Sequence, residues 1–377
     1  MKNLNSGSTI FGGGNSIMNK TRNSGEKIAR ITSKLNEFRV EGILFFDMKN
    51  IRYLTGFTGS DGALFIGEKG NVLLVDGRYV TQAKQEVSEF DIIEYTDKLT
   101  RLALLISDYN MKVVGFESSA LTYDTYLKLS NRLNDVTLEP LSEGINAIRA
   151  IKDTQEIDCI RKAATIASQS LQFIMNDIQP GISERDIALI LESKMKELGG
   201  ETLSFETIVA SGNNSALPHA KPGSRKIENG DFVVIDYGIV YQGYHSDETC
   251  TVAVGSVTQK QRETYQIVKD AHDRALDAVK EGISCREIDR IARDHIGKAG
   301  LEQYFSHGTG HGVGLEIHET PVISAKSDDY LTAGMIITIE PGVYIPDLWG
   351  IRVEDMVVVE RDGCEILSTV PKHLQIT

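Results

Sequence analysis

The sequence predicts a mixed α/β (α+β) fold arranged as two domains. The chain has 377 residues, which is enough for two domains of ordinary size. From about Lys27 onward, segments with the spacing of amphipathic helices alternate with short strand-like segments. All of the eight histidines except His373 lie between His219 and His318, so the chemistry is expected in the second domain.

The first predicted domain covers residues 21–145 and alternates helices with strands. Helical spacing predicts helices at residues 27–38 and 79–87, and apolar runs predict a strand at 42–46 and several strands, divided by glycine-rich turns, within 51–79. This domain contains no histidine and only scattered carboxylates. It is therefore expected to be a partner of the catalytic domain and not to contain the catalytic residues itself.

The first twenty residues are interpreted as a leader or tag-like segment outside both domains. Residues 1–20 are rich in glycine, serine and asparagine and lack the apolar core of a signal peptide. A second methionine at position 18 fits this interpretation. No stretch approaches the ~18 consecutive apolar residues of a membrane span, so no membrane association is expected.

Charge and cysteine content narrow the class of protein. The 40 basic and 53 acidic residues give a net charge of −13, which argues against a nucleic-acid or anionic-membrane surface. The four cysteines are scattered without a C-x-x-C pair, which is typical of reduced cytosolic thiols. A cytoplasmic protein that binds no nucleic acid is expected.

The second predicted domain, residues 146–377, combines amphipathic helices with strands. Ser183 is the expected N-cap of one helix, and Gly199 lies near its C-cap. Helices are predicted at residues 152–178, 183–199, 259–282 and 284–300. Strands are predicted at residues 232–241, 243–254, 335–345 and 351–360.

The segment HGTGHGVGLEIHE, residues 307–319, carries three histidines and four glycines. His307 and His311 have the i, i+4 spacing that places two zinc ligands on one helix face in HExxH sites. The alternate glycines disfavour a helix, because each costs about 0.8–1.0 kcal/mol relative to alanine in a helix interior. An extended loop is predicted instead. Neighbouring parts of the chain would approach its backbone closely, and its side chains would converge on a common site.

Asp236 lies within an apolar strand, and Asp247 follows eleven residues later in the next predicted strand. A buried carboxylate is costly unless it is paired or binds a metal. A hairpin turn at residues 241–242 would place the two aspartates opposite each other, whereas a turn at residues 242–243 would shift the register by two. Facing carboxylates repel each other, and a divalent cation bound between them would offset this repulsion.

Two further acids have similar surroundings near the C-terminus. Glu340 ends the apolar segment MIITIE, and Glu354 follows Arg352 by two residues on the same predicted strand face. Four carboxylates and one imidazole form the predicted ligand set: Asp236, Asp247, His311, Glu340 and Glu354. The set suits two adjacent divalent ions and favours Mn²⁺, with Co²⁺ or Zn²⁺ as alternatives. It indicates a hydrolase in which the ions activate water.

Each of these residues alone would be interpreted as a structural acid or a turn histidine. Their order along the chain, D-x10-D, HGxGHGxG, E-P-G and R-x-E-D, makes the metal site the better interpretation. In this order the motifs resemble the aminopeptidase P and prolidase branch of the metallopeptidases with the pita-bread fold. The segments NIRYLTGFTGSDGALFI and DGRY resemble its creatinase-type N-terminal domain, and the chain from about residue 150 resembles its catalytic domain.

The resemblance assigns the five ligands to a dinuclear metal site in which Glu354 and Asp247 bridge the ions. It also implies catalytic roles for five residues: His219, His307, His318, Glu340 and Arg352. The histidines would hold the substrate carbonyl and help to shuttle protons, and Glu340 would act as the general base. Arg352 would orient Glu354 from outside the ligand set.

The reaction implied by the resemblance is attack of metal-bound hydroxide on the bond between an N-terminal residue and a following proline. Aminopeptidase P-like activity on longer peptides is preferred, and a prolidase restricted to dipeptides is the alternative. Methionine aminopeptidase shares the five ligands but usually lacks a domain like residues 21–145. A metal-free peptide-binding module of the same fold is the non-enzyme alternative, which the presence of all five ligands opposes. The resemblance also implies a homodimer.

Overall fold

The computed structural model describes residues 24–141 and 146–377. The chain divides into two compact units, residues 1–141 and 142–377. The leader predicted at residues 1–20 lies outside the described residues. Within the described ranges, no helix is both long and apolar enough to cross a membrane.

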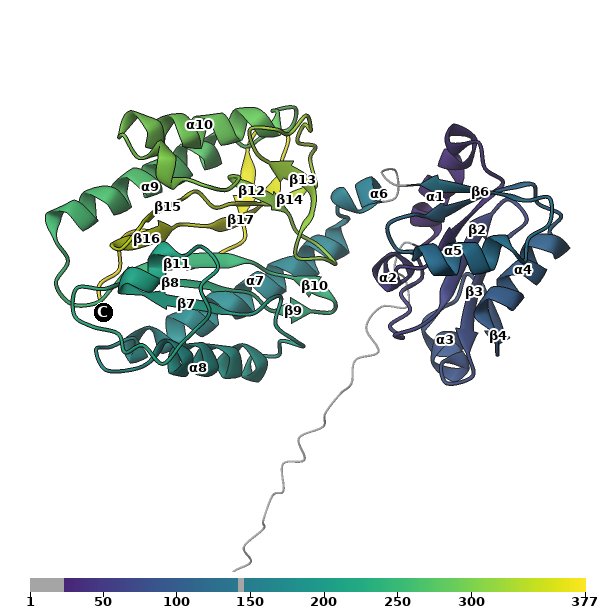
Figure 1. The fold of residues 1–377 in the computed structure, drawn as a ribbon, viewed down its shortest axis with the longest axis horizontal. Helices are drawn as coiled ribbons and strands as arrows, with labels where there is room; N and C mark the ends of the chain where they lie inside the picture. Colours follow the sequence, from purple (N-terminus) through teal and green to yellow (C-terminus); the bar gives the residue numbers. More distant parts are fainter. Residues whose placement is uncertain (1–23, 142–145) are drawn as a thin grey trace, which may run out of the picture. The chain divides into compact units, whose positions relative to one another are not determined.

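The first unit is built on a six-stranded sheet of order β4-β3-β2-β1-β5-β6 (Figure 1). Strands β1, β2 and β3 pair antiparallel, and the other neighbours pair parallel. Its strands are β1 Gly42–Phe45, β2 Ala63–Gly67, β3 Gly70–Asp76, β4 Asp91–Tyr95, β5 Val113–Glu117 and β6 Thr137–Leu141. Its helices are α1 Ser24–Phe38, α2 Met48–Thr55, α3 Val80–Glu86, α4 Lys98–Asp108 and α5 Tyr123–Ser130. The predicted α/β character is confirmed.

One element of this unit differs from its prediction: residues 51–55 belong to helix α2 rather than to a strand. The side chain of Asp47 caps the helix, and Gly56 ends it in the left-handed conformation with φ of 78°. Glu117 of β5 also accepts the backbone N–H groups of Phe46 and Asp47 at 2.6 and 2.8 Å. The helix start is therefore stabilised by a residue about seventy positions away, which local sequence patterns do not reveal.

In the second unit, two pairs of helices enclose the sheets (Figure 1). Helices α7 and α8 pack on strands that contribute Val233 and Ile235 to one core, and α9 and α10 pack on strands that contribute Ile337 and Val357 to another. The helices are α6 Asn146–Ala150, α7 Thr154–Ile174, α8 Glu184–Glu197, α9 Gln259–Ala278 and α10 Cys285–Lys298. Short 3₁₀ helices are η1 Met175–Asp177, η2 Gly212–Ala216 and η3 Glu302–Tyr304. The four predicted helices are confirmed, as is the N-cap at Ser183.

The strands of this unit form a three-stranded sheet, β11-β8-β7, a five-stranded sheet, β13-β12-β14-β17-β18, and two small hairpins, β10-β9 and β15-β16. Their bounds are β7 Ile208–Ser211, β8 Phe232–Tyr237, β9 Val240–Tyr241, β10 Tyr244–His245, β11 Glu248–Ala253, β12 Gly310–Gly312, β13 Glu319–Ile323, β14 Ile336–Ile339, β15 Gly342–Ile345, β16 Trp349–Arg352, β17 Asp355–Val359 and β18 Cys364–Ile366.

The predicted strands 335–345 and 351–360 are each divided in two. Strand β14 ends before Glu340 and Pro341, and β16 ends before Val353 and Glu354. Proline has no N–H to donate to a strand ladder, so Pro341 marks a natural break. At both breaks the chain passes between the five-stranded sheet and the β15-β16 hairpin. Glu340 and Glu354 therefore lie where the chain changes sheets.

The register between β8 and β11 decides between the two hairpin turns left open by the sequence. Asp236 pairs with Thr249 rather than with Asp247. The turn lies at Gln242 and Gly243, which have φ values of 50° and 81°, as in the tight hairpin turns that need positive φ at both central residues. The alternative shift by two residues is thus the one observed. It keeps Asp247 on the same face as Thr249, diagonal to Asp236.

Candidate metal centre

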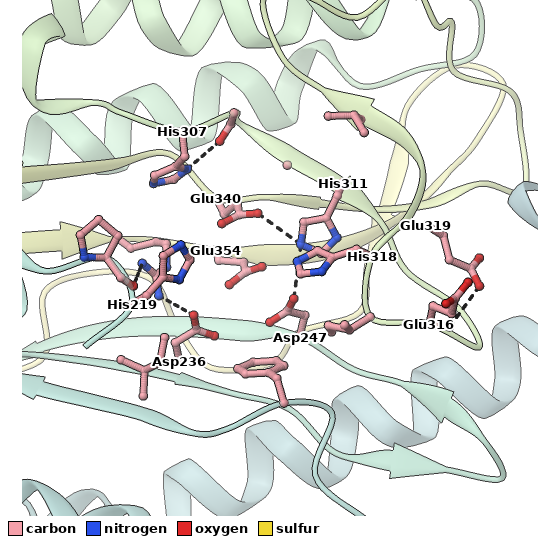
Figure 2. Close-up of a pocket in the computed structure, with 18 of the residues that line it drawn as sticks. His219, Asp236, Asp247, His307, His311, Glu316, His318, Glu319, Glu340 and Glu354 are labelled. Atoms are coloured by element: carbon pink, nitrogen blue, oxygen red, sulfur yellow. Dashed lines mark hydrogen bonds and ion pairs between the residues drawn. The ribbon is translucent and has the colours of Figure 1, made fainter. Parts of the chain in front are cut away.

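A cavity of about 880 Å³ in the second unit brings together all nine predicted site residues (Figure 2). Their side chains come from five segments of the chain: the 217–221 loop, the β8–β11 hairpin, the 307–319 loop, the break after β14, and the end of β16 with the break that follows it. The nine residues are His219, Asp236, Asp247, His307, His311, His318, Glu340, Arg352 and Glu354.

The ligand atoms of Asp247, His311 and Glu354 lie within 4.8 Å of one another, close enough to share one cation. The Nε2 atom of His311 is 3.5 Å from Asp247 Oδ2 and 3.4 Å from Glu340 Oε1. These separations are long for direct hydrogen bonds, but they suit atoms that each lie about 2.0–2.2 Å from a common metal ion. Three of the other four predicted ligands, Asp247, Glu340 and Glu354, therefore lie close to His311.

The fifth predicted ligand, Asp236, divides its two oxygens between different environments. Its Oδ2 pairs with Arg352, whereas its Oδ1 is buried and has no hydrogen-bond partner. Glu354 likewise has a buried Oε1 atom without a partner. A buried carboxylate oxygen left without a partner is costly, and a divalent cation would satisfy both atoms. The donor set therefore fits a metal ion.

Without a bound cation, each ionised carboxylate of the centre disfavours ionisation of its neighbours. Burial raises the pKa of Asp247 well above its usual range, and the charges of Glu354 and Asp236 raise it further. Burial, followed by the charges of Glu340 and Asp236, likewise raises the pKa of Glu354. A bound divalent cation reverses this effect, because it favours the ionised form of every carboxylate around it.

The three predicted non-ligand histidines occupy different positions around the centre. His307 is half-buried, with Nδ1 2.7 Å from the carbonyl of Gly308 and Nε2 2.9 Å from the hydroxyl of Tyr344. The ring of His318 lies 4.4 Å from that of His311, while His219 is exposed at the cavity wall. Burial lowers the pKa of both His307 and His318, so both rings are neutral near pH 7.

Arg352 connects the ligands to His307 through two hydroxyl groups that the sequence did not single out. Its Nη1 donates to the hydroxyl of Tyr344 at 2.6 Å, and that hydroxyl in turn contacts His307. Its Nε donates to Thr249 Oγ1 at 3.0 Å, and Thr249 Oγ1 donates to Glu354 Oε2 at 2.6 Å. Arg352 therefore contacts Asp236 directly and reaches Glu354 through Thr249.

The glycine-rich segment is extended, as predicted, and forms the short strand β12 around His311. A Cβ atom on Gly310 would lie 2.0 Å from the carbonyl oxygen of Thr338, and one on Gly312 would lie 2.4 Å from that of Thr320. Such distances exclude any side chain, so glycine is required for the backbones to approach. This close packing brings His311 into the cavity between β13 and β14.

The fold and the site together define a metallopeptidase with the pita-bread architecture. Residues 27–151 match the creatinase/prolidase N-terminal domain, and residues 158–361 match metallopeptidase family M24. The chain belongs to metallopeptidase family M24.

Relatives of known structure or name share nearly the whole chain. The sequence is 36% identical over 352 residues to the Xaa-Pro dipeptidase of Pyrococcus horikoshii. The matched region covers 93% of this chain and 98% of that protein. An Xaa-Pro dipeptidase structure from Bacillus anthracis matches with a TM-score of 0.92 and 38% identity, covering 94% of this chain and 100% of that one. An X-Pro aminopeptidase from Thermotoga maritima matches with a TM-score of 0.87 and 33% identity, covering 93% and 100%.

Proposed function

We propose that this protein hydrolyses the bond between an N-terminal residue and a following proline, with two divalent ions in the cavity described above. The observation that carries the proposal is the convergence of five ligand side chains with two buried carboxylate oxygens that lack a partner. The ligands would be Asp236, Asp247, His311, Glu340 and Glu354. When bound, the ions supply an activated water and polarise the scissile carbonyl.

The residues around the ligands have roles in substrate binding and proton transfer. Glu340 is the proposed general base, as the family resemblance implies; its Oε1 faces His311 and accepts a hydrogen bond from Thr338 at 3.2 Å. His219 and His318 line the cavity and would hold the substrate carbonyl. His307 is oriented by Tyr344 and would take part in proton transfer.

The site favours an aminopeptidase that accepts peptides longer than two residues. A dipeptide places its terminal carboxylate next to proline, and such a group is normally bound by a cation. Arg149, which lines the cavity and is buried, contacts Glu319 at 3.0 Å, and Arg352 pairs with Asp236. Among the described residues, the cavity lining contains one more lysine or arginine, Lys221, and this side chain contacts Glu206 at 2.8 Å on the surface. A dipeptide carboxylate would have to compete with these partners.

A strict dipeptidase is the second candidate, because two of the relatives compared above are named Xaa-Pro dipeptidases. Turnover of Ala-Pro and Ala-Pro-Ala, by metal-free protein with and without added Mn²⁺, separates the candidates. Metal-dependent release of alanine from Ala-Pro-Ala is the expected result. Cleavage of Ala-Pro alone would identify a dipeptidase.

Metal binding provides an independent test of the proposal. We expect Asp236→Ala to lose both bound metal and activity, whereas an active, metal-free variant would contradict the assignment. Wild-type protein that binds no divalent ion even after loading would support the metal-free binding module instead. Manganese as the ion, the homodimer and the cytoplasmic location remain predictions.

A further inference from the structure

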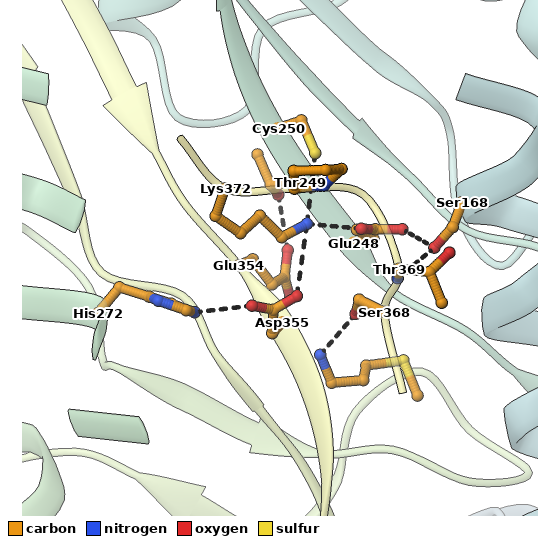
Figure 3. A network of polar contacts seen from close by, with 12 residues as sticks. Ser168, Glu248, Thr249, Cys250, His272, Glu354, Asp355, Ser368, Thr369 and Lys372 are labelled. Carbon is orange, nitrogen blue, oxygen red and sulfur yellow. Dashed lines mark hydrogen bonds and ion pairs between the residues drawn. The ribbon is translucent and has the colours of Figure 1, made fainter. Parts of the chain in front are cut away.

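Behind the metal centre lies a buried cluster of charged groups that the proposed reaction does not use (Figure 3). The predicted ligands Asp247 and Glu354 are each followed directly by a second carboxylate, Glu248 and Asp355. Glu248 is the first residue of β11, and Asp355 is the first residue of β17. Successive side chains of an extended chain point to opposite faces. The second carboxylates therefore point away from the cavity.

Both of these carboxylates contact one amine, that of Lys372. The Nζ atom of Lys372 lies 2.5 Å from Glu248 Oε1 and 3.5 Å from Asp355 Oδ1. The side chains of these three residues are only 8%, 2% and 7% exposed, respectively. Charges that are removed from water to this extent need a partner of opposite sign. Lys372 provides that partner to both.

The remaining contacts of the cluster fix each carboxylate further. Glu248 Oε2 accepts hydrogen bonds from Ser168 at 2.6 Å and from Tyr237 at 2.9 Å. Asp355 Oδ2 lies 3.3 Å from Nε2 of His272. Each carboxylate thus has an outer partner of its own, and Lys372 is the group they share.

Lys372 reaches this position because the C-terminal segment is bound along β11. The backbone N–H of Ala253 donates to Gln375, and that of Thr377 donates back to Ala253, both at 2.9 Å. Nearer the cluster, the N–H of Thr369 donates to the hydroxyl of Ser168 at 2.9 Å. The segment that carries Lys372 is therefore held on both sides of the lysine.

We propose that Lys372 is a positioning residue for the metal centre. By binding Glu248 and Asp355 together, it joins the first residue of β11 to the first residue of β17, and these strands belong to different sheets. Each joined residue is the immediate neighbour of a ligand. Lys372 therefore sets the spacing between Asp247 and Glu354 without touching the metal or the substrate.

The inference rests on the metal centre proposed above, and titration calorimetry of metal-free protein with Mn²⁺ alone tests it. We expect Lys372→Met to weaken Mn²⁺ affinity by about tenfold, the lower end of the loss that follows removal of a group bonded to a ligand, because Lys372 acts through the residues next to the ligands. Absence of Mn²⁺ binding by the wild type would refute the metal centre itself. A Lys372→Met variant that binds Mn²⁺ as tightly as the wild type would refute only the positioning role.

Lys152→Met is the matched control, because this lysine is also buried, with a side chain 2% exposed, and pairs with Glu319 at 3.2 Å. It should lower thermal stability without changing Mn²⁺ affinity. Equal losses of affinity in both lysine variants would mean that the Lys372 effect is general destabilisation, and would overturn the inference.

A second variant keeps the test decisive if Lys372→Met does not fold. The double variant Lys372→Met, Glu248→Gln removes one positive and one negative charge, while Asp355 keeps its contact with His272. It should fold, because the charge imbalance is removed, and should still bind Mn²⁺ about tenfold or more weakly, because the link between the strands is lost. Wild-type affinity in the folded double variant would overturn the inference.

Discussion

At the scale of single residues, the hydroxyl of Thr249 has an unusual position between two charged groups. It accepts from Arg352 Nε at 3.0 Å and donates to Glu354 Oε2 at 2.6 Å. Thr249 is fully buried, so the hydroxyl has no water to replace either partner. The orientation of Glu354 therefore depends on a neutral side chain that is not itself a ligand.

Thr249→Val preserves the side-chain shape and removes only this hydroxyl. We expect Mn²⁺ affinity to fall by about tenfold, because Glu354 loses the donor that fixes its Oε2 atom. Stability should fall by about 1–3 kcal/mol, the usual result of leaving buried polar groups without a partner. Calorimetric titration with Mn²⁺ and urea unfolding measure the two effects. Unchanged affinity would show that Glu354 is oriented without Thr249.

The glycines around His311 offer a second prediction at this scale. Gly310→Ala would place a methyl group 2.0 Å from the backbone oxygen of Thr338, so β12 and β14 must separate. We expect loss of Mn²⁺ binding together with a lower melting temperature. Gly363→Ala is the control, since a Cβ there meets nothing within 4 Å. Similar melting temperatures for the two variants would show that the strands can adjust.

The sequence identifies charged site residues better than neutral ones. The nine predicted residues all line one cavity: five were predicted from the order of the motifs and four from the family resemblance. Carboxylates within apolar strands are unusual enough to stand out in a sequence. Thr249 and Tyr344 went unnoticed, since threonine and tyrosine are ordinary residues of strands. Only their contacts in the folded protein show that these two side chains belong to the site.

At the scale of elements, helix α10 supports the loop that carries the histidines. Arg293 donates to the backbone oxygens of Phe305 and His307 at 2.9 and 2.8 Å. It also forms a two-point ion pair with Asp289, which accepts the Thr309 hydroxyl at 2.9 Å. The loop is therefore fixed to α10 on both sides of Gly308.

Arg293→Met keeps the aliphatic stem but removes the guanidinium. We expect a loss of about 1–3 kcal/mol in the free energy of unfolding, because Asp289 and two carbonyls lose a donor, together with slower turnover of Xaa-Pro peptides. Arg290→Met on the same helix is the control. Its side chain is 58% exposed and pairs with Glu287 and Asp294, so a loss below about 1 kcal/mol is expected. Equal effects in urea unfolding would contradict the proposed support of the loop.

The element-scale predictions failed or stayed open where distant residues decide the local structure. The start of helix α2 is stabilised by Glu117 of strand β5, which is distant in sequence. The β8–β11 register depends on the position of the turn, for which the sequence allowed two alternatives. The breaks at Glu340 and Glu354 arise because the chain moves between two sheets. The long helices were predicted correctly, because their caps and apolar stripes are local signals.

At the scale of the whole molecule, the two units differ in what they contain. Every predicted ligand lies in residues 142–377, and so does Trp349, the one tryptophan of the sequence. Trp349 is part of β16, which leads through Arg352 to Glu354. Tryptophan fluorescence therefore reports unfolding of the metal-binding unit, whereas far-ultraviolet circular dichroism reports both units.

Binding of Mn²⁺ should consequently stabilise one unit and not the other. A ligand at a hundred times its Kd stabilises the native state by about 2.7 kcal/mol, which corresponds to a shift of about 5–10 °C for a unit of this size. We expect the fluorescence transition to move upward by this amount when Mn²⁺ is added to metal-free protein. Circular dichroism should then show a second, unshifted transition from residues 24–141. If both signals move together, the two units unfold cooperatively, and the first unit contributes to the stability of the metal centre.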